Sequence, residues 1–223
     1  MEPTKKNTRI TGLIGIIVLV SGSFTHSVNS KLISYEDKFA TANNFINYES
    51  LFRIGFISSL IMETVFIFYA FNLYRILKPV NKNLSMIMLI LALIPVPLFM
   101  LNQLNQFDAF LLANNDIEEM MFFLTVHKHG GLIVSIFFGL WLFPLGLLIY
   151  QSKYLPKILG IFLMVGCFGY LIHFFQGFLI PNFESSLWTN PFLIITHISE
   201  LLLMLWLLIK GLNIEKWKKV TEI

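Results

Sequence analysis

The sequence predicts an all-α, polytopic transmembrane helix bundle with six spans, and three observations predict it. Of the 223 residues, 56% are hydrophobic and only 13% are charged, whereas soluble domains carry about 25% charged residues. Six apolar segments are long enough to cross a hydrocarbon core about 30 Å thick as α-helices. Basic residues cluster in the short connections between these segments. We therefore expect a single integral membrane domain over residues 1–223, in a lipid bilayer.

The predicted spans follow one another along the chain. They comprise residues 10–28, 51–77, 84–101, 132–150, 158–180 and 192–209. The first follows Lys5, Lys6 and Arg9, a pattern that is also typical of a cleaved signal peptide. We favour an uncleaved span, because small polar residues such as Ser21 and Ser23 pack readily between membrane helices.

The connections predict the orientation of the chain. Pro79 and Pro156 stand in the short connections 78–83 and 151–157, where helices should end. Twelve of the 16 Lys and Arg residues fall on the side of these connections, so the positive-inside rule predicts cytoplasmic termini. The longer connections 29–50 and 102–131 then face outward. The apolar run MMFFLTV in the second of these is expected to form an interfacial helix.

Composition also limits the partners and the chemistry. The formal net charge of +3 comes from separate basic clusters and not from a basic stripe, so we expect no nucleic-acid partner. Cys167 is the only cysteine, which excludes an intrachain disulfide and a CxxC motif. Pro95 and Pro97 are expected to kink the third span.

Ionisable residues inside the spans are the candidates for a functional site. Glu200 lies in the middle of the apolar run 191–211, and His197 precedes it by one helical turn on the same face. A carboxyl group at this depth is costly unless it faces a partner or a water-filled cavity. Counting about 1.5 Å per residue from the basic anchors places Glu63 at a similar depth and His173 in the outward half of the bilayer.

We therefore expect an outward-opening polar pocket that binds a small ligand, a cation or a lipid headgroup. Its predicted residues are Glu63, His173, His197 and Glu200, with Arg53 and His129 near the outer interface. Structural alternatives stay open for each residue. Glu63 would then pair only with Arg53 or a histidine, and the His197 and Glu200 pair would only fix the last span. The polar run at residues 102–106 is expected to be a helix end that emerges into water.

Histidine and carboxylate side chains support three further functions. Zinc held by His173, His197 and Glu200 would define a metal-dependent membrane hydrolase. Membrane hydrolases of the alkaline-ceramidase and adiponectin-receptor superfamily have similar parts, arranged in Ser-x-x-x-His and His-x-x-x-His patterns. This chain lacks both patterns. Haem held by facing histidines such as His173 and His129 would define a redox protein. A solvated cavity around Glu63 and Glu200 would suit a small transporter, although no inverted repeat is visible.

Three segments resemble a known family. They are LFRIGFISSLIMETVFIFYAFNLYRILKPVNKNLSMI from Leu51, GLWLFPLGLLIYQSKYLPKILGIFLMVGCFGYL from Gly139, and SELLLMLWLLIKG from Ser199. The Lys-Pro turn after the second span, the SKYLPKILG turn and the ELxLxLWLLxKG ending carry the likeness. Residues 8–212 resemble the bacterial membrane family catalogued as domain of unknown function 4386. The resemblance implies a multi-pass protein of a bacterial inner or plasma membrane, and it implies no activity or catalytic residue.

Overall fold

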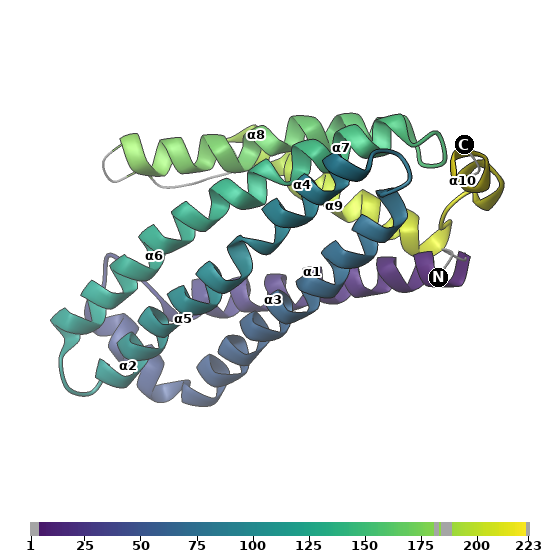
Figure 1. Ribbon diagram of the computed structural model, residues 1–223. Helices are drawn as coiled ribbons and strands as arrows, with labels where there is room; N and C mark the ends of the chain where they lie inside the picture. The colour runs from purple at the N-terminus through teal and green to yellow at the C-terminus, as the bar shows by residue number, and fades with distance from the viewer. Residues whose placement is uncertain (1–4, 181–182, 184–188, 222–223) are drawn as a thin grey trace. The chain divides into compact units, whose positions relative to one another are not determined.

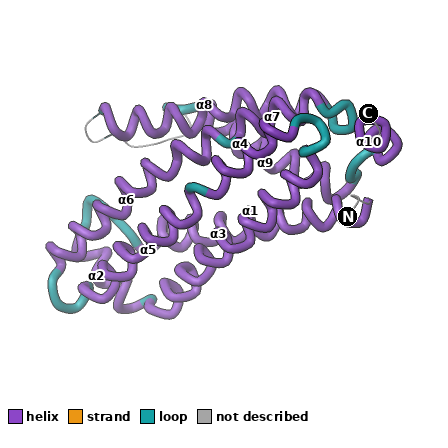
Figure 2. Tube along the Cα trace, in the orientation of Figure 1, coloured by secondary structure: helices purple, strands orange, loops and turns teal. Residues whose placement is uncertain are grey.

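The computed structural model describes residues 5–180, 183 and 189–221, and in this part of the chain all regular structure is helical (Figures 1 and 2). The helices are α1 (Lys5–Leu32), α2 (Lys38–Asn47), α3 (Glu49–Leu77), α4 (Lys82–Leu93), α5 (Pro95–Leu112), α6 (Ile117–Leu140), α7 (Leu142–Gln151), α8 (Lys157–Leu179), α9 (Pro191–Ile209) and α10 (Ile214–Thr221). The all-α prediction is therefore confirmed.

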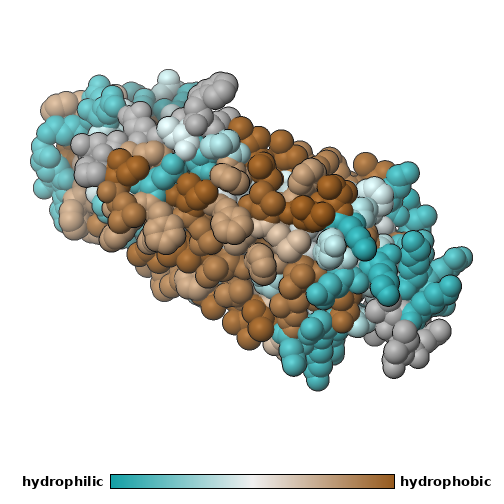
Figure 3. All heavy atoms as spheres, turned by 90° about the horizontal axis from the view of Figure 1, so that it is seen from above, coloured by the Kyte–Doolittle hydropathy of each residue, from teal (hydrophilic) through white to brown (hydrophobic). Residues whose placement is uncertain are grey.

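In the described part of the chain, six helical stretches are long and apolar enough to cross a membrane, as predicted. They are Lys5–Leu32, Glu49–Leu77, Lys82–Leu112, Ile117–Gln151, Lys157–Leu179 and Pro191–Ile209. Many large hydrophobic side chains on these helices are exposed, and hydrophobic residues make up most of the face drawn in Figure 3. Such a surface suits contact with lipid, since a bilayer core is as apolar as these side chains.

Local sequence sets where the helices begin and end. The Asp37 carboxylate caps α2 by accepting a hydrogen bond from the Ala40 amide at 2.8 Å. Pro191 occupies the start of α9, where its missing N–H costs nothing, and Gly211 ends that helix with φ +69°. Pro95 begins α5, and Ile94, the single residue between α4 and α5, keeps helical dihedral angles. The predicted kink of the third span stays a prediction.

The outer connections contain more helix than the sequence predicted. α2 lies within the connection 29–50, and α5 and α6 occupy most of the connection 102–131. The MMFFLTV run belongs to α6 and does not form a separate interfacial helix, so that prediction was wrong. The helix continues from this run through Gly130 and Gly131 into the following span, because no proline interrupts it and an established helix propagates at little cost.

The described chain divides into two compact units. Unit 1 comprises residues 1–16, 66–95 and 132–223, and unit 2 comprises residues 17–65 and 96–131. Helices α1, α3 and α6 contribute residues to both units. Each unit is described separately below.

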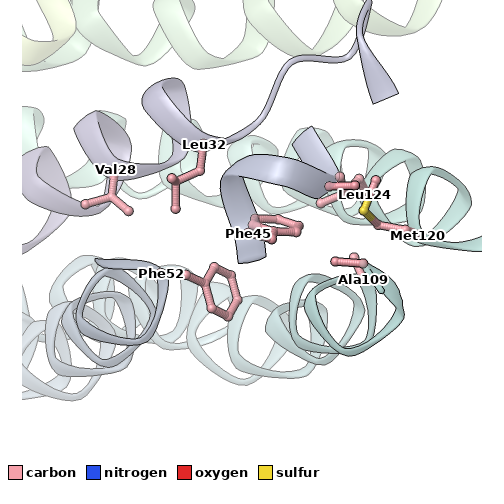
Figure 4. Packing of buried hydrophobic residues seen from close by; sticks show 9 residues of the cluster. Val28, Leu32, Phe45, Phe52, Ala109, Met120 and Leu124 are labelled. Carbon is pink, nitrogen blue, oxygen red and sulfur yellow. The ribbon is translucent and has the colours of Figure 1, made fainter. Parts of the chain in front are cut away.

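Unit 2 is built around a cluster of buried hydrophobic residues (Figure 4). The rings of Phe45 on α2 and Phe52 on α3 meet edge to face, with 5.1 Å between their centroids. The Phe52 ring also stacks on the Phe110 ring of α5, with 4.3 Å between centroids. Phe45 and Phe52 are almost completely buried. Val28, Leu32, Ala42, Ala109, Ala113, Met120 and Leu124 complete the cluster. The side chain of Phe45 therefore anchors the short helix α2 to its unit.

Unit 1 brings α8 into close contact with both α7 and α9. Glycines make this approach possible. A Cβ atom added to Gly160 of α8 would lie 2.5 Å from the Gly146 carbonyl oxygen of α7. A Cβ atom added to Gly169 would lie 2.7 Å from the Phe192 carbonyl oxygen of α9. Small residues at such contacts let membrane helices pack backbone to backbone.

The turn that follows α7 is held in unit 1 by a hydrogen bond from Tyr154 to the backbone of α3. The Tyr154 hydroxyl donates to the Ile76 carbonyl oxygen at 2.8 Å, and Trp217 Nε1 of α10 donates to the same oxygen at 3.3 Å. Burial raises the pKa of Tyr154 above its usual value.

The start of α1 meets the end of α9, where Arg9 Nη2 donates to the Ile209 carbonyl oxygen at 2.9 Å.

Candidate functional site

Glu200 lies on α9 in unit 1, and its side chain is half-buried. The Tyr170 hydroxyl on α8 donates to Glu200 Oε2 at 3.5 Å, which is at the long limit for a hydrogen bond. Glu200 also interacts electrostatically with Tyr69, a buried residue of α3 in the same unit. The Glu200 carboxyl group is therefore reached by the Tyr170 hydroxyl through one long hydrogen bond.

His197 is part of the same arrangement. It lies one turn before Glu200 on α9, and its ring meets the Tyr170 ring edge to face at 6.0 Å between centroids. Tyr170 thus contacts both residues that the sequence had placed on one helix face. Sequence reasoning did not include Tyr170 in the site, although its position one turn before His173 on α8 was a usable signal.

His173 continues this line of polar side chains on α8. It is half-buried, and its Nδ1 atom is buried with no hydrogen-bond partner among the residues that the structure describes. Gln176, one turn further along, donates from Nε2 to the Thr189 carbonyl oxygen at 2.8 Å. The described part of the chain places no three His, Cys, Asp or Glu side chains where they could hold one metal ion. Zinc binding by His173, His197 and Glu200 therefore gains no support from this geometry.

The other three predicted site residues belong to unit 2. Glu63 on α3 is only 1% exposed, and its Oε2 atom is buried without a partner among the described residues. Arg53 is exposed, and its Nε atom donates to Glu49 at 2.7 Å. It lies ten residues before Glu63 on the same helix, about 15 Å away along the axis, so it pairs with Glu49 and not with Glu63. His129 is exposed.

The polar run at residues 102–106 is where the structure differs most from expectation. Asn102, Gln103 and Gln106 are buried in unit 2 and do not emerge into water. The Asn102 side chain donates to the His127 carbonyl oxygen at 2.9 Å, and His127 Nδ1 lies 3.1 Å from the Asn102 carbonyl oxygen. Gln106 donates to Asn29 Oδ1 at 2.9 Å. Partners on α6 and α1 thus bond to Asn102 and Gln106, which look exposed in the sequence.

Each unit has a hollow in its described part, and no predicted site residue lines either of these two. The hollow in unit 1 has a volume of about 180 Å³ and is lined by Asn7, Thr8, Ile10, Thr11, Asn72, Arg75 and Ile76. The hollow in unit 2 has a volume of about 220 Å³ and is lined by Phe45, Ile46, Glu49, Phe110, Leu111, Ala113 and Asn114. The predicted pocket therefore stays a prediction.

Six helical stretches of the described chain that are long and apolar enough to cross a membrane define a multi-pass α-helical membrane protein. The chain belongs to the family described as domain of unknown function (DUF4386), whose family model matches residues 10–211. An uncharacterized protein of Archaeoglobus fulgidus is 32% identical over 142 residues, which cover 64% of this chain and 74% of that protein. No solved structure matches the chain. The family assignment agrees with the resemblance seen in the sequence.

Proposed function

We propose that this protein binds a small, positively charged ligand at Glu200, Tyr170 and His197, in the part of unit 1 formed by α8 and α9. The observation that carries the proposal is the Glu200 carboxyl group itself. It stands in the middle of an apolar span, and the hydrogen bond that it accepts from Tyr170 is 3.5 Å long. A carboxylate in a membrane requires stronger compensation than this, and a cationic ligand would supply it.

The side chains around Glu200 favour an amine as the ligand. The Tyr170 hydroxyl reaches the carboxyl group, and the Tyr170 ring lies against the His197 ring; aromatic faces attract ammonium groups through their quadrupole. His197 adds a hydrogen-bonding group one turn away on α9. A carboxylate flanked by aromatic rings recognises a protonated or quaternary amine, either of a free small molecule or of a lipid headgroup.

We further propose that both termini are cytoplasmic and that the protein lies in the inner or plasma membrane of a bacterial cell. Twelve of the 16 basic residues support this orientation through the positive-inside rule. In this orientation His197 lies on the outward side of Glu200, so the ligand would enter from the outer face. Zinc hydrolysis, haem binding and transport have no separate observation in their favour.

Thermal unfolding of the detergent-purified protein tests the binding proposal. Ethanolamine, choline and putrescine are each added at equal ionic strength, with sodium acetate as the anionic comparison. We expect at least one amine to raise the Tm of the wild type and to have no effect on Glu200→Gln. Glu215→Gln, which removes an exposed carboxylate from α10 of the same unit, should respond like the wild type. An amine shift that persists in Glu200→Gln, or no shift with any amine, contradicts the proposal.

The two sources of the amine can be separated in the same assay. If only vesicle-derived phosphatidylethanolamine or phosphatidylcholine raises the Tm, and free ethanolamine and choline do not, the ligand is a lipid headgroup. If the free amines act alone, the ligand is a small soluble molecule. Both results require the Glu200 carboxyl group.

A further inference from the structure

Unit 2 contains two buried oxygen atoms that lack hydrogen-bond partners among the described residues. They are Glu63 Oε2 on α3 and Gln103 Oε1 on α5. Glu63 is 1% exposed and Gln103 is 2% exposed, so lipid headgroups and bulk water do not reach them. An unsatisfied buried acceptor costs about 1–3 kcal/mol, more when it is charged. Both atoms need a donor or a cation.

The packing of α3 against α5 places these two residues near each other. Phe52 stacks on Phe110 at 4.3 Å, and Phe56 meets Phe107 at 5.7 Å. Residue numbers therefore rise along α3 as they fall along α5, which makes the helices antiparallel. Continuing this register by one turn brings Ser59 opposite Gln103, and Glu63 follows one turn further along α3.

Ser59 adds a third oxygen to the same position. It is completely buried, and its hydroxyl donates to the Phe56 carbonyl oxygen at 2.6 Å. Because the hydroxyl hydrogen points at this carbonyl, the lone pairs of Ser59 Oγ point away from the bond. Ser59 and Glu63, four residues apart, share one face of α3. A carboxylate, an amide oxygen and a hydroxyl oxygen thus come from two adjacent helices.

No basic side chain of unit 2 is engaged with Glu63 in the part of the chain that the structure describes. The four lysines and arginines of the unit each contact another group. Lys38 pairs with Glu118, Arg53 pairs with Glu49, Lys31 lies 4.9 Å from the centre of the Tyr48 ring, and Lys128 lies 4.8 Å from the centre of the Tyr35 ring. The neighbouring amides are also occupied, because Asn102 bonds to His127 and Gln106 bonds to Asn29. Among the described lysines and arginines of unit 2, none therefore balances the charge of Glu63, which favours a cation bound from outside the unit.

We propose that Glu63, Gln103 and Ser59 form a binding site for a monovalent cation of the size of Na⁺. Hard oxygen donors select hard cations such as Na⁺, Mg²⁺ and Ca²⁺. A single carboxylate balances one positive charge, which favours the monovalent ion. This site lies in unit 2 and does not depend on the ligand proposed for Glu200.

Cation-dependent thermal unfolding tests the site. The purified protein is unfolded in NaCl, LiCl, KCl and CsCl at equal ionic strength, in the Glu200→Gln background so that an effect at Glu200 is removed. We expect NaCl to raise the Tm above that in CsCl by roughly 3–6 °C at ten times the Kd. Equilibrium binding of ²²Na⁺ should give one ion per chain.

Two variants and a matched control locate the effect. Glu63→Gln should abolish the Na⁺ shift, and Gln103→Leu should weaken it. Glu49→Gln removes an exposed carboxylate from the same helix and should leave the shift unchanged. An identical Tm in all four salts overturns the proposal, as does a shift that survives Glu63→Gln. If Tm depends on pH and not on Na⁺, Glu63 holds a proton or an ordered water and the cation site is refuted. If Glu63→Gln does not fold, ²²Na⁺ binding to Gln103→Leu decides.

Discussion

Replacing Gly169 by alanine tests the close contact of α8 with α9 that holds Tyr170 beside Glu200. A Cβ atom at this position would lie 2.7 Å from the Phe192 carbonyl oxygen and would also clash with Thr196 Oγ1. The Phe192 carbonyl oxygen belongs to the backbone and cannot rotate away. Relieving the clash therefore requires α8 and α9 to separate by several tenths of an ångström. Overpacking of this kind costs about 1–3 kcal/mol.

Gly131→Ala on α6 is the matched control, because a Cβ atom added there meets no atom within 4 Å. Both substitutions gain the same helix propensity, about 1 kcal/mol. The difference between the variants therefore isolates the clash. We expect the Tm of Gly169→Ala, measured by thermal unfolding in detergent, to be roughly 4–8 °C below that of Gly131→Ala. Equal Tm values would refute the close approach of the two helices.

Two other predictions concern stability. Phe45→Ala removes a buried ring whose centroid lies 5.1 Å from that of Phe52 and 5.9 Å from that of Phe110. The loss should cost about 3–5 kcal/mol and lower the Tm, whereas Phe39→Ala on the exposed face of α2 should change the Tm little. A similar loss in both variants would contradict the anchoring of α2. Tyr154→Phe should lower the Tm at pH 8 by the loss of one hydrogen bond, about 1 kcal/mol. Because burial raises the pKa of Tyr154 above its unfolded value near 10, its neutral form stabilises the fold fully below pH 10 and progressively less above it. The gap between the wild type and Tyr154→Phe should therefore narrow from pH 9 to pH 11, and a constant gap would contradict the assignment.

Hydropathy was sufficient to predict the number of spans, and a proline begins α5, as the position of Pro95 in the third span suggests. Both signals are local, since a bilayer requires apolar length and a proline removes its own N–H regardless of tertiary contacts. The shared face of His197 and Glu200 was also predictable from their spacing, and both residues contact Tyr170.

The burial of Asn102, Gln103 and Gln106 could not be predicted in the same way. Their environment depends on partners that are remote in sequence, such as Asn29, which is 77 residues from Gln106. A run of amides is polar in any single-sequence analysis, whether it meets water or another helix. Asn102, Gln106, Ala109 and Ala113 follow one another at intervals of four, three and four residues, so they share one helix face. The two alanines, both buried, were the available signal that this face of α5 continues inward.

Glu63 shows why a single residue's depth does not determine its role. Counting residues along α3 predicted a position for Glu63 near the middle of the membrane. The Glu63 side chain is 1% exposed. Its expected partner Arg53 instead pairs with Glu49 one turn away, because a helix brings residues four apart together and separates those ten apart.

Calorimetric titration of an amine into the purified wild type and into Glu200→Gln tests the central claim most directly. The amine is the one that gives the largest Tm shift among ethanolamine, choline and putrescine. We predict saturable binding of one amine per chain to the wild type and no measurable heat with Glu200→Gln. Equal binding to both proteins would contradict a site built on the Glu200 carboxyl group.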